Sequence, residues 1–127
     1  MKTKFKIRLA YTLLIVIFAS TLTSCQKQNT VSIKYLISKA SSTYDLQYKD
    51  QNGSLLEIEV NPNSGEDIWE YSFISEEGEV VYISTKYFDT NSSINMQILI
   101  DGKVFKQTEE IGDPLKYIVV SGVVPIK

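Results

Sequence analysis

Apolar and polar residues alternate with a period of two along most of the chain beyond residue 30, which is typical of β-strands with one buried face. No stretch of this region shows the period of an amphipathic helix. Turn-forming pairs, such as Asn52 with Gly53 and Asp101 with Gly102, separate the alternating runs. Residues of these types tolerate positive φ, so both pairs predict type I′ hairpin turns. The runs predicted as strands are 31–35, 44–48, 56–60, 69–73, 81–83, 94–100, 103–108 and 117–124.

About eight short strands separated by turns predict an all-β domain over residues 31–127, either an antiparallel β-sandwich or a small barrel. Trp69 is the candidate for the centre of its core. Tyr71 and Phe73 share a face with Trp69, and Ile98 is expected in the core as well. The alternative for the aromatic stripe of strand 69–73 is a platform for a ligand.

The N-terminal segment has the organisation of a targeting signal and not of a folded element. Residues 1–8 include four basic residues and no acidic one, and residues 9–19 form an apolar run. Such a run fits a signal sequence and is too short to cross a bilayer comfortably as a helix. The next residues resemble the lipobox of bacterial prolipoproteins, which are lipidated on the cysteine and cleaved before it. These residues are Leu22, Thr23, Ser24 and Cys25.

This interpretation divides the chain into a lipoprotein signal peptide (1–24), a lipidated tether (25–30) and a β-sandwich domain (31–127). It predicts a diacylglyceryl thioether on Cys25, and two or three acyl chains anchor a protein in a membrane firmly. The tether has no acidic residue that could act as a surface-export signal, and Gln26 is not the aspartate that retains lipoproteins of enteric bacteria in the inner membrane. We therefore expect a place on the outer membrane, facing the periplasm.

Composition narrows the chemistry open to the domain. The chain has no histidine and one cysteine, which excludes an internal disulfide, zinc sites built from these residues and histidine-dependent triads. Loss of the signal peptide removes four of 13 basic residues and none of 15 acidic ones, which leaves a formal charge of −6. This charge disfavours nucleic-acid binding. The carboxylates gather in turns, where turn chemistry and solvation explain them, so we expect no catalytic residue, metal or cofactor.

Tyr87 and Phe88 form the candidate binding surface. They are adjacent large aromatic residues in a segment, 86–93, that reads as a loop between strands. Exposed aromatic side chains on a loop suit contact with sugars, lipids or a protein partner. The alternative is that one of the two rings closes the end of the sandwich.

Several local patterns occur together in one order along the domain. They are a V-x-I-x-Y strand at 31–35, a G-x-x-V-Y-I-S strand at 78–84, strands paired around an Asp-Gly turn at 96–106 and a V-S-G-x-V strand at 120–124. In this order the domain resembles a family of small Bacteroidota lipoproteins related to the MmpS (mycobacterial membrane protein small) transport accessory proteins. The resemblance implies an immunoglobulin-like β-sandwich of about seven or eight strands, no catalytic residues and an envelope transport system as partner.

The leading hypothesis is therefore a lipid-anchored, non-enzymatic accessory or binding module of the cell envelope. An alternative is a periplasmic inhibitor of a hydrolase such as lysozyme, because an acidic domain would complement a basic enzyme. A third hypothesis is a carbohydrate enzyme that uses a pair of carboxylates.

Overall fold

The computed structural model describes residues 29–127, and the expected lipobox with Cys25 lies outside the described residues. The described chain forms strands and contains no helix that could span a membrane. The strands are β1 (Thr30–Ser38), β2 (Tyr44–Lys49), β3 (Leu55–Val60), β4 (Trp69–Glu76), β5 (Val80–Tyr87), β6 (Ser93–Ile100), β7 (Lys103–Ile111) and β8 (Ile118–Val123).

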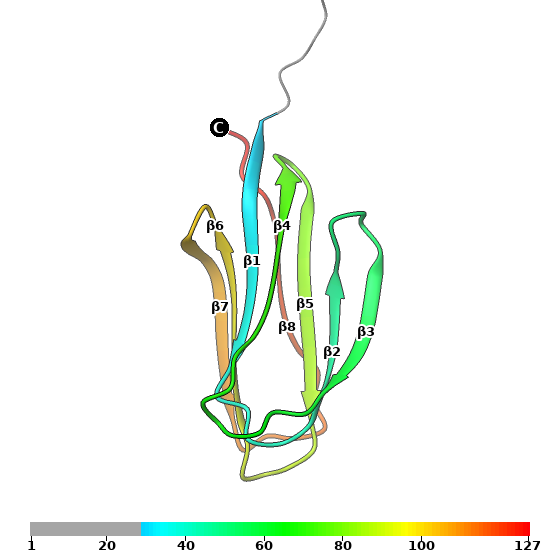
Figure 1. The fold of residues 1–127 in the computed structure, drawn as a ribbon, viewed down its shortest axis with the longest axis vertical. Coiled ribbons are helices and arrows are strands. Elements are labelled where there is room, and N and C mark those ends of the chain that lie inside the picture. Colours follow the sequence, from blue (N-terminus) through cyan, green and yellow to red (C-terminus); the bar gives the residue numbers. More distant parts are fainter. Residues whose placement is uncertain (1–28) are drawn as a thin grey trace, which may run out of the picture.

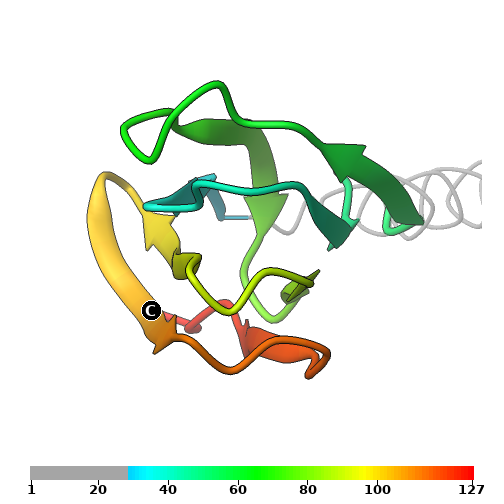
Figure 2. The same ribbon diagram turned by 90° about the horizontal axis from the view of Figure 1, so that it is seen from below.

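The strands form two four-stranded antiparallel sheets with the orders β4-β1-β6-β7 and β3-β2-β5-β8. The predicted antiparallel β-sandwich is thus confirmed (Figure 1). The connections β2–β3 and β6–β7 are hairpins within a sheet, and the others cross between the sheets. The start of β1 and the C-terminus lie at one end of the sandwich, here called the N-terminal end (Figure 1). The loops 61–68, 88–92 and 112–117 lie at the other end, the loop end, towards which Figure 2 looks.

The two hairpin turns differ from one another. Asp101 and Gly102 both have positive φ, at 50° and 80°, as the type I′ prediction requires. In the β2–β3 hairpin Gly53 has a positive φ and Asn52 does not, so the type I′ prediction for this turn is wrong. The physical reason is Asp50, whose carboxylate accepts hydrogen bonds from the backbone N–H groups of Asn52 (2.9 Å) and Ser54 (2.8 Å). These bonds favour an Asx-type turn in which a single left-handed residue suffices.

The core lies between the sheets and is centred on tyrosine and aliphatic side chains. Tyr35, Tyr44 and Tyr87 are among its largest fully buried side chains, and Ile98 is fully buried as well. Trp69, expected at the centre, is instead half-buried at the edge of the core. The reason is topological, because β4 is an edge strand that pairs only with β1. Tyr71 and Phe73, on the same face of β4, are half-buried in the same way.

The Tyr35 hydroxyl group ties the two sheets together. Tyr35 stands on β1, and its hydroxyl donates a hydrogen bond to the Lys49 carbonyl of β2 (3.0 Å) and accepts one from the Tyr82 N–H of β5 (3.3 Å). The β2–β5 pairing ends one residue earlier, at Tyr48 and Ile83, so the phenol fills the place of the next ladder position. Burial is the main reason that the pKa of Tyr35 is raised to about 12.

Replacing Tyr35 with Phe should lower the free energy of unfolding by about 1–3 kcal/mol, because it leaves a carbonyl and an N–H unpaired at a partly buried position. Urea denaturation followed by circular dichroism measures this difference. Tyr117→Phe is the matched control, since Tyr117 is exposed and its hydroxyl makes no hydrogen bond with another described residue. Equal stability of Tyr35→Phe and the control would contradict a role for the hydroxyl.

Candidate functional site

The two flanks of the sandwich are built differently. On one flank the ring of Phe105 (β7) lies against Gly122 (β8), so closely that a Cβ atom at Gly122 would stand 2.6 Å from the ring. This contact closes that flank. On the opposite flank, Leu56 and Ile58 of β3 pair with residues on the inner face of β2, yet they remain 38% and 37% exposed. The edge strand β4 therefore leaves the inner face of β3 only partly covered.

A row of aromatic rings borders this open flank. Trp69, Tyr71 and Phe73 alternate along β4, with ring centroids 6.5 Å and 5.4 Å apart. The ring of Tyr48 lies beneath them, 5.2 Å from Trp69 and 5.0 Å from Tyr71. We call these four rings, with Leu56 and Ile58, the aromatic flank. The alternation in the sequence placed the three β4 rings on one face, but it could not show that this face lies at a flank.

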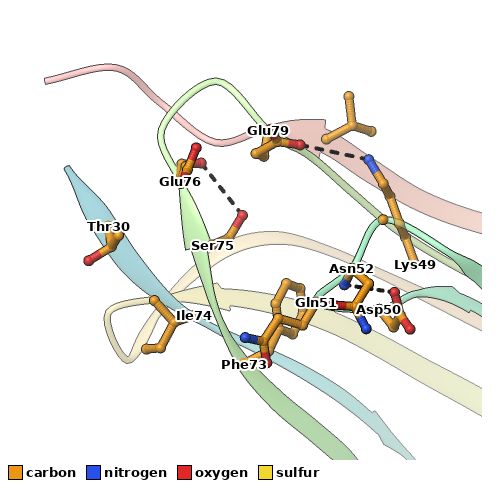
Figure 3. A pocket seen from close by; sticks show the side chains of 12 residues that line it. Thr30, Lys49, Asp50, Gln51, Asn52, Phe73, Ile74, Ser75, Glu76 and Glu79 are labelled. Atoms are coloured by element: carbon orange, nitrogen blue, oxygen red, sulfur yellow. Dashed lines mark hydrogen bonds and ion pairs between the residues drawn. The ribbon is translucent and has the colours of Figure 1, made fainter. Parts of the chain in front are cut away.

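A pocket of about 450 Å³ lies at the N-terminal end of the aromatic flank, and Figure 3 shows the side chains around it. Phe73 lines it from β4, and the β2–β3 hairpin contributes the side-chain amides of Gln51 and Asn52. Neither amide has a hydrogen-bond partner among the described residues. An ion pair of 4.0 Å between Lys49 and Glu79 borders the same pocket.

A smaller pocket of about 220 Å³ lies at the loop end of the aromatic flank. Trp69 and Tyr44 supply its aromatic lining, and Asn61 and Asp67 supply its polar groups. Asn61 is held by a hydrogen bond from the Thr43 hydroxyl, and the Asp67 carboxylate accepts one from the Asn63 N–H (2.6 Å). The aromatic row thus runs from one pocket to the other, with hydrogen-bonding side chains at both ends.

The predicted pair of Tyr87 and Phe88 is divided between the interior and the surface. Tyr87 is fully buried, so its place in an exposed binding surface is wrong and the alternative, that one of the two rings closes the end of the sandwich, is confirmed. Phe88 is 49% exposed at the loop end. Alternation explains the division, since Tyr87 is the last residue of β5 and faces the core. The Tyr87 hydroxyl accepts a hydrogen bond from the Asp113 N–H (2.9 Å) and its carbonyl accepts one from the Leu115 N–H (2.9 Å), which positions the loop before β8.

The loop end carries exposed apolar side chains besides Phe88. Leu115 and Tyr117 are exposed on the neighbouring loop, and the ammonium group of Lys86 lies 5.6 Å from the ring centroid of Phe88 and 5.2 Å from that of Tyr117. Sequence reasoning missed Leu115 and Tyr117, because nothing in the local pattern relates residues 112–117 to Phe88 across the fold.

The described residues bring together no group of three or more Asp, Glu, His or Cys side chains that could hold a metal ion. Comparison of the chain with known proteins yields no matching family model and no matching curated protein. Cys25, Leu22, Thr23 and Ser24 lie outside the described residues. Between residues 29 and 127, the candidate features are the aromatic flank with its two pockets and the exposed apolar side chains of the loop end.

Substitution of the two adjacent rings should separate their roles. Tyr87→Ala should destabilise the fold by about 3–5 kcal/mol, because it empties a buried ring position and releases the loop before β8. Phe88→Ala should change stability by less than about 0.5 kcal/mol, as an exposed substitution does. Thermal denaturation of both variants checks this. A large loss of stability for Phe88→Ala would show that its ring belongs to the core.

Proposed function

We propose that this chain is a bacterial cell-envelope protein, lipidated on Cys25, that acts as a non-enzymatic accessory or binding module. The observation that carries the proposal is how soon after Cys25 the fold begins. Asn29 stands four residues after it, and its carbonyl accepts a hydrogen bond from the Glu77 N–H in the β4–β5 turn (3.1 Å). Its side-chain amide donates to the Glu77 carboxylate (3.4 Å).

A tether this short sets which end of the sandwich faces the membrane. Four residues span at most about 14 Å, so the N-terminal end would stay within that distance of the lipid-bearing cysteine. Strand β1 has nine residues and runs along the sandwich for about 30 Å. The loop end would accordingly project away from the membrane surface.

In this orientation the exposed side chains of the loop end would be accessible to a partner in the envelope. Phe88, Leu115 and Tyr117 would face the space in which envelope partners lie, and exposed apolar side chains on loops suit protein contact. At the N-terminal end, the carboxylates of Asp50 and Glu77 would disfavour adhesion to anionic lipid headgroups. The resemblance to the MmpS-related lipoproteins favours an envelope transport system as the partner.

Lipidation can be tested on the cysteine itself. In a bacterial host, wild-type protein should incorporate radioactive palmitate and sediment with membranes, and Cys25→Ser should do neither. Ser24→Ala is the control, because it leaves the acceptor thiol in place and should still be labelled. Palmitate on the Cys25→Ser variant would sink the proposed anchor.

Partner contact at the loop end can be tested by photo-crosslinking in intact cells. A photoreactive phenylalanine analogue at position 88 should give discrete adducts with an envelope protein. The same analogue at Val104, which is 51% exposed on β7, should give few adducts. The two positions are equally exposed, so equal crosslinking at both, or none at either, would count against a binding role of the loop end.

A further inference from the structure

We propose that the aromatic flank binds a neutral glycan chain that lies along β4 between the two pockets. The inference deepens the proposed role as a binding module and rests on it, but it does not depend on the lipid anchor or on the loop end.

The rings supply the first argument. Sugar rings present C–H faces that pack against aromatic rings, while their hydroxyl groups point outward in the ring plane. Trp69 and Tyr71 lie at consecutive inward positions of one strand, and their planes differ by only 17°. Phe73 continues the row at the next inward position. All three rings remain half-buried, so the interior of the sandwich does not use their whole surface.

The polar groups at both ends supply the second argument. Hydroxyl groups of a sugar need donors and acceptors, and planar amides and carboxylates provide both in fixed geometry. Gln51 and Asn52 offer amides without protein partners in the larger pocket. Asn61 and Asp67 stand in the smaller pocket, positioned by their own hydrogen bonds. Polar groups beside aromatic rings are the combination that orients a ligand in its site.

The charge of the residues that line the pockets favours a neutral polymer over an anionic one. Among the described residues, Asp50 and Glu79 line the larger pocket with one ammonium group, that of Lys49, and Asp67 lines the smaller pocket with no basic side chain beside it, so an anionic glycan or a nucleic acid would be repelled.

An extended peptide is the other polymer that could bind here, by adding a strand to one of the two edge strands. Glutamate side chains stand on the outer faces of both edge strands, at Glu57 and Glu59 on β3 and at Glu70 on β4. Charged side chains on an edge strand oppose the addition of another strand. The glycan is therefore the better occupant of this flank.

The chain contains one tryptophan, and it is part of the site. Trp69 fluorescence of the full-length protein, in a detergent without a sugar headgroup, can be followed while chitohexaose, cellohexaose or maltohexaose is added. At least one of these neutral hexasaccharides should change the emission saturably. Heparin, as an anionic glycan, and a neutral valine–threonine octapeptide should not.

Variants show whether the binding involves the aromatic flank. Tyr71→Ala should weaken the affinity by about tenfold, the effect of losing one stacked ring. Gln51→Ala, in an exposed turn where it cannot unfold the domain, should weaken it several-fold, and Tyr117→Ala outside the flank should leave it unchanged. The inference would be overturned if none of the three hexasaccharides gave a saturable response, or if only the octapeptide did. It would also be overturned if Tyr71→Ala and Gln51→Ala bound the hexasaccharide as tightly as the wild-type protein does. Palmitate labelling and crosslinking at position 88 do not depend on this result, so failure here is distinguishable from failure of the proposed function.

Discussion

The hydrogen bonds of one buried hydroxyl group, that of Tyr35, link the two sheets at the point where β2 and β5 separate. The phenol reaches from β1 across the core to the Lys49 carbonyl and the Tyr82 N–H, which would otherwise be unpaired where β2 and β5 separate. Unpaired groups of this kind are costly in a protein interior, so the bridge allows the two strands to diverge. The β2–β3 hairpin projects beyond this point, and its residues 49–53 form one side of the larger pocket (Figures 1 and 3).

The differences between the edges of the sandwich follow from the same topology. Phe105 against Gly122 closes the flank between β7 and β8, while the flank between β3 and β4 keeps a row of half-buried rings. A domain without internal disulfides depends on its core for stability, and rings left partly exposed at an edge contribute less apolar burial than rings in the core. A ligand that covers them would recover that apolar burial. The short tether proposed above would leave this flank accessible from the side.

The sequence predicted where the strands lie along the chain better than it predicted which strands are neighbours in the sheets. Alternation located every strand, because it reports which side chains share a face, and the turn at Asp101 and Gly102 has the predicted conformation. It could not show which strands become edges, and for that reason Trp69 was expected at a centre that Tyr35 and Tyr44 occupy. The pattern offered Tyr87 and Phe88 either as one surface or with one ring closing the end of the sandwich, and it could not decide between the two because it did not show where β5 ends. The two pockets depend on contacts between strands far apart in the sequence, which no local signal records.

Amide hydrogen exchange at Tyr82 tests the central structural claim most directly. In the wild-type protein the Tyr82 N–H should exchange slowly, since its acceptor is a buried hydroxyl. In Tyr35→Phe it should exchange at least about tenfold faster, while amides of the β6–β7 hairpin keep their rates. Unchanged protection of the Tyr82 amide in Tyr35→Phe would contradict the claim that this hydroxyl joins the sheets.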